Sequence, residues 1–388
     1  MPRNRVIYQS EGLYVGKDAS LGAIEDHEQL GRVQSANYSF TINRQDVNQF
    51  GDLARIDSLV LDPPTVSLDF SYYLTDGFNE RSLGFFVQNS GAKANSQRDA
   101  NADAFSSGNF ASGHLTSNSG VNFFIVTSPD GEDLNKADDG EALASNDTVI
   151  GIGNCYISDY SVDLSVGSLP TVNVTVEGAN MNSATDASAG NIPTPSINQA
   201  LGTTGTNLVT LPNPTQDGGI TGQKGTAAIT ALRPGDVTLD LATLNGESLV
   251  TINGADGAHV QSASISLPLS RTPIDRLGSR FPFAREVDFP VNATLNVSAI
   301  VANSQAQNLA SILNSGAQEA SITVKDQLGN AAASYLLKGL KLDSQSFSSS
   351  IGSNKTVDLT FSTQIGGPND VVNGVFMSGI GANSVFTA

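Results

Sequence analysis

The chain has 388 residues, of which only 15% are charged, and it contains no tryptophan. Its formal net charge is −18 and no basic stripe occurs along it, which excludes tight phosphate binding and sequence readout of nucleic acids. The abundance of Gly, Ser, Asn, Thr and Ala favours sheets and polar turns over long charged helices.

The chain begins with a mixed arm and continues into two alternating segments. In the arm we expect short strands at Val6–Tyr8 and Leu13–Val15, and a short polar turn or helix at Ala23–Leu30. Apolar and polar residues then alternate in Val33–Ile42 and again in Pro64–Tyr73. A period of two directs one row of side chains into a core, so both segments are predicted to be amphipathic strands.

The excursion between these strands, Asn43–Pro63, is too long for a tight turn. It contains Phe50, Leu53, Ile56 and Leu59, which make it too apolar for a loop left in water. A long protruding hairpin that presents apolar side chains needs a surface to contact. We expect that surface on another molecule; the alternative is that the hairpin folds back on its own domain.

After the second strand we expect a short helix at 75–87 and a strand at Val121–Thr127. The Gly/Ser/Asn/Ala-rich segment 88–120 between them is expected to be an insertion that decorates the outside and that the core does not need. The acidic segment 130–141 lacks the spacing of an EF-hand loop. It is expected to be a solvated loop, with a bound cation as the alternative.

The second half of the chain repeats the first. Without a gap, Val260–Ile300 matches Val33–Tyr73 both in identities and in alternation. The identities pair Val33, Gln34, Ser35, Ala36, Ser39, Arg44, Gly51, Val60, Pro63, Leu68 and Ser71 with Val260, Gln261, Ser262, Ala263, Ser266, Arg271, Gly278, Val287, Pro290, Leu295 and Ser298. Near the end of each half, Gly167 and Gly352 lie between two strand patterns, where a hairpin turn is expected.

The repeat predicts a mainly β protein made of two tandem β-sandwich or barrel domains, each with a long protruding hairpin and one flanking α-helix. The first domain covers 1–177 and the second 226–365. Residues 178–225 are rich in Gly, Pro, Thr and Asn and are predicted to be an extended, unpacked linker. Residues 366–388 form a Gly/Asn-rich C-terminal tail.

The second domain is expected to repeat the helix and the strand that follow the hairpin. Leu309, Ile312 and Leu313 share one helical face, which predicts a helix at Asn303–Ser315. A strand is predicted at Ser321–Asp326, opposite the first-domain strand.

No catalytic, cofactor or metal constellation stands out. The three histidines, His27, His114 and His259, lack a second ligand at metal spacing and are expected at the surface. Cys155 is single, which excludes an intramolecular disulfide, and its alternating context predicts a small buried residue. No G-x-S-x-G, phosphate-binding glycine loop, C-x-x-C or H-E-x-x-H occurs. The sequence therefore predicts no enzyme, no cofactor and no metal.

The first-half stretch SANYSFTINRQDVNQFGDLARIDSLVLDPPTVSLDFSYYLTDGFNE resembles the tail tube proteins of tailed bacteriophages. So does the layout of sandwich, long hairpin and flanking helix, and the resemblance covers both halves. It implies stacked pseudo-sixfold rings that form a hollow tail for DNA, with the hairpin docked on the adjacent ring. The duplication resembles members that fuse two domains per chain and form trimeric rings.

The resemblance implies that the two hairpins make the ring-to-ring contacts, with Arg44 and Arg271 at their bases and Gly51 and Gly278 at their turns. The implied contact residues are Arg44, Asp46, Asn48, Phe50, Gly51, Leu53, Arg271, Ile274, Leu277, Gly278 and Phe281. The implied partners are further copies of the chain and other tail proteins (terminator, distal tail protein and tape measure), with DNA only in transit.

The implied location is the virion tail, assembled in the host cytoplasm. The N-terminus lacks the apolar core of a signal peptide, and no segment approaches membrane-spanning length, so no membrane insertion is expected. One alternative is a neck, baseplate-hub or capsid decoration protein of the same fold. Another is a surface-binding β-sandwich adhesin, which should show exposed aromatic residues clustered in one loop.

Overall fold

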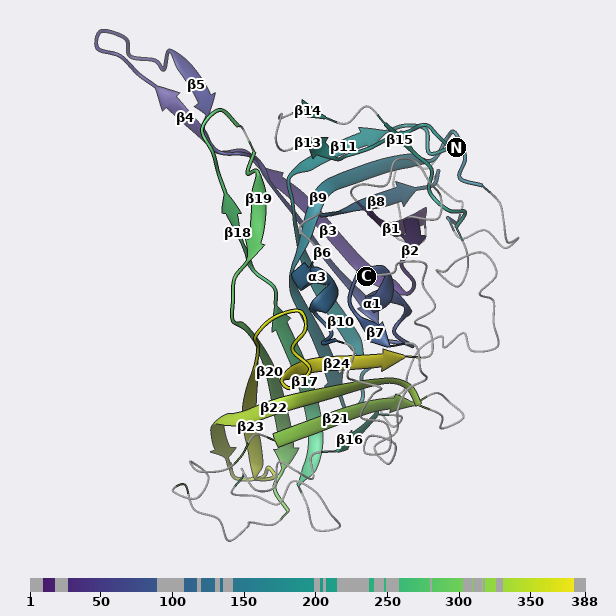
Figure 1. Ribbon diagram of the computed structural model, residues 1–388, viewed down its shortest axis with the longest axis vertical. Helices are drawn as coiled ribbons and strands as arrows, with labels where there is room; N and C mark the ends of the chain where they lie inside the picture. Colours follow the sequence, from purple (N-terminus) through teal and green to yellow (C-terminus); the bar gives the residue numbers. More distant parts are fainter. Residues whose placement is uncertain are drawn as a thin grey trace.

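The protein is described here from a computed structural model (Figure 1). The structure describes residues 10–17, 27–88, 108–116, 120–129, 133–134, 142–198, 203–204, 207–214, 237–240, 248, 258–279, 281–302, 309, 316, 318–325 and 331–379.

The described chain is mainly β, with two short helices, α1 (Phe78–Ser82) and α3 (Ser112–Thr116). The strands of the first half are β1 (Glu11–Lys17), β2 (His27–Gln29), β3 (Val33–Thr41), β4 (Arg44–Val47), β5 (Asp57–Val60), β6 (Thr65–Tyr73), β7 (Val87–Gln88), β8 (Val121–Thr127), β9 (Thr148–Ser165), β10 (Thr171–Gly178) and β11 (Asn180–Ala184). Four two-residue strands follow: β12 (Ile192–Pro193), β13 (Ile197–Asn198), β14 (Thr203–Thr204) and β15 (Leu208–Val209). The later strands are β16 (Val237–Asp240), β17 (His259–Pro268), β18 (Arg271–Ile274), β19 (Ala284–Val287), β20 (Val291–Ile300), β21 (Gln318–Lys325), β22 (Ala331–Ser348), β23 (Thr356–Ile365) and β24 (Gly374–Gly379).

The amphipathic strands predicted from alternation are confirmed as β3, β6, β17 and β20, and the predicted strands at 121–127 and 321–326 are confirmed as β8 and β21. In β6, every second side chain from Val66 to Tyr72 is buried, while its neighbours face outward. The same alternation runs through β20. Burial of this row is the main force that fixes the strands, because removing apolar area from water stabilises the fold.

Strand register repeats between the two halves of the chain. The β3–β6 pairing shifts register between Val33 and Ser35, and the β17–β20 pairing shifts between Val260 and Ser262, which lie 227 positions later. The long strands β9 and β22 also correspond, because Val162 faces Val172 as Phe347 faces Val357. Both hairpin glycines that follow, Gly167 and Gly352, adopt left-handed φ angles of 88° and 87°, so the turns predicted there are confirmed.

The two halves share one sheet and one core. Strand β17 of the second half pairs antiparallel with β9 of the first, and β24 pairs parallel with β7. The order of neighbouring strands along the main path of the shared sheet is β16–β21–β22–β23–β20–β17–β9–β10–β6–β3 (Figure 1). A single hydrophobic cluster contains buried side chains of both halves, from Leu13 to Met377.

The insertion 88–120 was expected to be dispensable for the core, and its described part contradicts this. Phe110 is fully buried and stacks on Phe85 with ring centroids 4.3 Å apart. Its amide donates to the carbonyl of Val375 in the second half, at 2.7 Å. The Gly-, Ser- and Asn-rich composition of the segment gave no indication that Phe110 packs between the halves.

The expected linker and tail are also packed where the structure describes them. Strand β11 extends the sheet beside β9, and the segment after it buries Ala187, Ile192 and Val209 in a second core cluster. Strand β24, in the expected tail, pairs with β22 and buries Val375 and Met377. Backbone pairing needs no apolar composition, which is why the Asn-rich β11 can join the sheet, whereas β24 contributes three consecutive buried apolar residues.

The N-terminal arm matches its prediction only in part. Gln29 and its neighbours form strand β2, not the expected turn or helix, while Leu13 lies in β1 as expected for a strand. The predicted second-half helix, at 303–315, and the acidic segment 130–141 lie largely outside the described residues, as does Val6–Tyr8.

Replacing Phe110 by alanine should destabilise the protein by about 3–5 kcal/mol, because it removes a fully buried ring between the halves. The half-buried neighbour Phe86 provides the matched control and should cost clearly less as Phe86→Ala. Urea unfolding of both variants measures the difference. Equal losses would mean that Phe110 does not join the halves.

Candidate functional site

Two long hairpins project from the sheet in the same direction (Figure 1). The first pairs β4 with β5 and rises between β3 and β6, while the second pairs β18 with β19 and rises between β17 and β20. Gly51 and Gly278 adopt left-handed φ angles of 98° and 86°, which suit tight turns. The first hairpin reaches furthest from the sheet.

The first hairpin presents its apolar side chains to solvent. Phe50 and Leu53 near its turn are fully exposed, and Ile56 is about half exposed. Asp46 of β4 forms an ion pair at 2.9 Å with Arg55, which lies just before β5, and Asn48 and Arg44 are exposed. Soluble proteins rarely leave such a contiguous apolar surface without a partner. The hairpin does not fold back on its own half.

The second hairpin has the same plan with fewer apolar residues. Leu277 is fully exposed at the turn, and Ile274 and Phe283 are partly exposed. Phe281 is half-buried, and its carbonyl accepts a hydrogen bond from the Ser279 hydroxyl at 2.6 Å. Both apolar surfaces therefore lie at the same end of the molecule.

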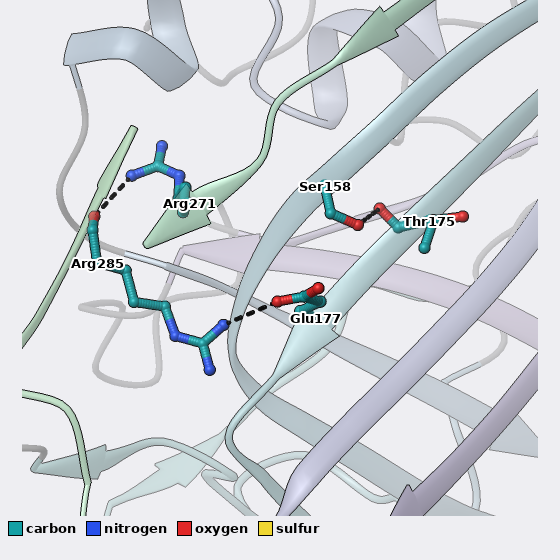
Figure 2. A network of polar contacts seen from close by, with 5 residues as sticks. All are labelled: Ser158, Thr175, Glu177, Arg271 and Arg285. Carbon is teal, nitrogen blue, oxygen red and sulfur yellow. Dashed lines mark hydrogen bonds and ion pairs between the residues drawn. The ribbon is translucent and has the colours of Figure 1, made fainter. Parts of the chain in front are cut away.

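The base of the second hairpin is anchored on the first half by two arginines. Arg285 forms an ion pair with Glu177 at 3.4 Å, and Arg271 donates to the carbonyl of Arg285 at 3.2 Å (Figure 2). Arg271 also donates to the carbonyl of His114. Both guanidinium groups also stack over Tyr156, at 4.8 Å for Arg271 and 5.5 Å for Arg285. Nearby, the Ser158 hydroxyl donates to the Thr175 carbonyl at 3.2 Å, where β9 is irregular (Figure 2).

Arg44, which corresponds to Arg271 in the repeat, lies exposed on β4. The two arginines expected at the hairpin bases are therefore in different environments in a single chain. The structure brings together Arg271, Tyr156 and Glu177, and it leaves the first hairpin without that support.

At the junction of the halves, β17 and β9 cover each other's edges, and among the described strands none covers the matching edge of β3 or of β22 around Phe347. At the junction, Ile265 of β17 faces Val162 of β9, and both are at most 1% exposed. The corresponding residues are Tyr38 on β3 and Phe347 on β22, and Phe347 is 44% exposed. Phe40, next along β3, is 60% exposed although its counterpart Leu267 is buried. An edge strand with unpaired backbone groups and exposed apolar side chains is a template for pairing with another chain.

The sheet has a polar outer face at the same junction. A shallow groove of about 330 Å³ crosses β9, β17, β20 and β23. Its polar lining consists of Asp163, Ser165, Ser262, Ser264, Asn296, Ser298, Asp358 and Thr360. Neighbouring strands continue this surface, with Asn173 donating to Asp163 at 3.0 Å. Carboxylates and neutral hydrogen-bonding groups therefore dominate the middle of the face.

A buried polar network connects the halves inside the core. The Glu80 carboxylate of α1 accepts hydrogen bonds from Tyr72 at 2.9 Å and from Tyr160 at 3.3 Å, and the Tyr160 hydroxyl lies 2.8 Å from that of Tyr335. Burial raises the pKa of Glu80 to about 7, and the negative charge of Asp76 adds to the rise, while the tyrosine hydrogen bonds oppose it.

Of the histidines expected at the surface, His27 is buried and His114 is half-buried. His27 lies in β2 against the edge of Phe124, and His114 lies in α3 against Phe85. Burial, together with the nearby positive charge of Arg271, lowers the pKa of His114 to about 3, so its imidazole is neutral. His259 is exposed on β17, as expected. Cys155 is buried in β9, which confirms that prediction.

Sequence comparison identifies no relative. No protein-family model matches the chain, and no curated protein matches it. Within the described ranges, neither helix has the length and apolar character to cross a membrane.

The Glu80→Gln variant should change how stability depends on pH. Because the pKa of Glu80 is raised from 4.5 to about 7, its contribution is fully present below about pH 4.5 and is lost as the pH rises through 7. Wild-type protein should therefore lose on the order of 3 kcal/mol relative to the glutamine variant between pH 4.5 and 8. Urea unfolding at several pH values measures this loss. Parallel pH profiles for the two proteins would contradict it.

Proposed function

We propose that the chain is a structural virion protein of a tailed bacteriophage, which assembles as trimeric rings that stack into the tail tube. One observation carries the proposal. Among the described residues, β17 covers the edge of β9, whereas β3 ends the strand path of the sheet and the part of β22 around Phe347 pairs with β23 and with no other described strand. A molecule with complementary edges at its two ends is suited to head-to-tail association, which closes into a ring when the rotation permits.

The repeated register gives the contact between chains in detail. The junction inside the chain pairs Ile265 with Val162. In the repeat, Ile265 corresponds to Tyr38, 227 positions earlier, and Val162 corresponds to Phe347, 185 positions later. The same pairing between neighbouring chains would place Tyr38 of one chain opposite Phe347 of the next. The same shift places Phe40 opposite Gln345. This pairing would cover the exposed aromatic side chains of Phe40 and Phe347.

Three chains in one ring contain six sheet halves, in keeping with the pseudo-sixfold plan of the tail tube proteins that the sequence resembles. The two apolar hairpins of each chain point to the same end, which supports a role in joining one ring to the next. Stacking would remove Phe50, Leu53 and Leu277 from water.

The polar face is suited to line the channel. Asp163 and Asp358 lie there among serine, threonine and asparagine side chains. Negative charge repels phosphate, and neutral polar groups offer no fixed binding pattern to DNA, so a duplex would slide along such a wall. In this proposal the chain is not an enzyme and acts with further copies of itself and with other tail proteins.

A pair of cysteines tests the contact between chains. Tyr38→Cys together with Phe347→Cys should give covalent dimers and trimers under oxidising conditions, because directly opposed residues of antiparallel strands lie within disulfide distance. Non-reducing gel electrophoresis with mass spectrometry of the linked peptide measures the product. The matched control, Asn37→Cys with Phe347→Cys, directs one thiol to the other sheet face and should cross-link far less.

Electron microscopy of the purified wild-type chain tests the tube itself. Tubes with a central channel and threefold end views are the expected result. Isolated rings would instead favour the neck, hub or decoration role, and single chains without disulfide linkage would contradict ring formation.

A further inference from the structure

Apolar hairpins that join rings need a receiving surface on the next ring, and that surface must occur twice per chain. Most of the exposed large hydrophobic residues in the described chain lie on the two hairpins or on the free edges. Among the others, Val166 and Ile351 are 68% and 108% exposed, and they are counterparts in the repeat. Leu208, Leu309 and Val372 have no such exposed counterpart.

Both residues occupy the apex of the same turn. Val166 lies in the sequence Ser-Val-Gly-Ser and Ile351 in Ser-Ile-Gly-Ser. In each turn the second serine amide donates to the carbonyl of the first, at 3.3 Å in residues 165–168 and 3.2 Å in residues 350–353, and the two serine hydroxyls contact each other. The following glycine has the positive φ that such a turn favours, and the β-branched side chain before it is exposed.

The turns lie at the end of the sheet opposite the hairpins. Thr171, just after the first turn, pairs with Tyr73, at the end of β6 furthest from its hairpin. In the second half, Thr356 pairs with Ile300 in the same way. A strand of this length separates the two ends by roughly 30 Å. Apolar hairpins and apolar turns thus occupy opposite ends of the molecule, as stacking by translation along one axis requires.

Each turn also lies at a junction between sheet halves. The amide of Val166 donates to the carbonyl of Gln261 at 2.9 Å, across the junction of β9 and β17. By the same shift of register, Ile351 would lie beside Gln34 of the next chain. A ring of three chains would therefore present six equivalent apolar turns, one at each junction.

We propose that the turns at Val166 and Ile351 are part of the surface that receives the hairpins of a second copy of the chain in the adjacent ring. This inference rests on the proposed function. It assigns the receiving side of the ring-to-ring contact, and it makes the contact heterologous, with six hairpins on one side and six turns on the other.

Charge at the turns tests the inference. The Val166→Asp/Ile351→Asp variant should form rings but lose tubes, because an apolar contact does not accommodate unpaired carboxylates. Both side chains are exposed in the single chain, so folding should be retained, and Val166→Ser/Ile351→Ser offers a milder version. Leu208→Asp, an exposed apolar residue on β15, is the matched control and should form tubes of wild-type length.

Mixing two defective variants gives the decisive result. A hairpin variant, Phe50→Asp/Leu53→Asp/Leu277→Asp, keeps its turns, and the turn variant keeps its hairpins. Each alone should give only single rings, while the mixture should give stacks of two rings, visible by sedimentation velocity and electron microscopy. Tubes of wild-type length from both the aspartate and the serine turn variants, or a mixture that stays as single rings, would overturn the inference and leave the proposed function intact. A wild-type chain that forms no tubes would overturn both.

Discussion

The unpaired edge of a β-sheet is the constraint on which the rest of this molecule depends. Strand β17 covers the edge of β9 and buries Ile265 and Val162 against each other. Because the halves repeat the same register, the same need arises at β3 and at the end of β22, where no strand of the described chain covers the edge. Edges can be blocked by charge or proline, yet here they carry Phe40 and Phe347. Among the described strands, these two matching edges have no neighbour.

The junction inside the chain is more strongly built than the one proposed between chains. Inside, Arg271 and Arg285 stack over Tyr156, and Arg285 pairs with Glu177. The counterparts of Tyr156 and Glu177 in the second half are Lys341 and Ser362, which offer neither an aromatic face nor a carboxylate to Arg44. Phe110 and the tyrosine network around Glu80 add contacts between the halves that no simple repeat would supply. A proposed ring would thus alternate two kinds of junction.

Sequence reasoning succeeded where one physical signal dominates. Alternation with a period of two located β3, β6, β17 and β20, and in β6, β17 and β20 it reflects a row of buried side chains, whereas β3 has none buried in the single chain. It failed at β11, whose Asn-rich sequence carries no apolar pattern, and at β24, whose short apolar run Val375–Met377 lies in a Gly- and Asn-rich context. The candidate contact residues on the hairpins could be chosen because they are apolar in a polar context. The uncovered edges could not, because only pairing shows which strand lacks a neighbour. The sequence did not point to Glu80, because the place of its carboxylate in the core depends on tertiary contacts with Tyr72 and Tyr160.

If the chain assembles into the proposed ring, the presence of both halves in one polypeptide limits how the ring can gain or lose units. Separate halves could add to a growing circle one at a time, so a miscount would change the circumference by a single unit and distort each junction slightly. Halves joined in pairs can only be gained or lost together. Gaining or losing one chain therefore changes the ring by two halves, and the angular misfit shared among the other junctions is twice that of a single half. Because each chain brings two halves, the proposed ring can contain only an even number of halves, and this disfavours rings of the wrong size.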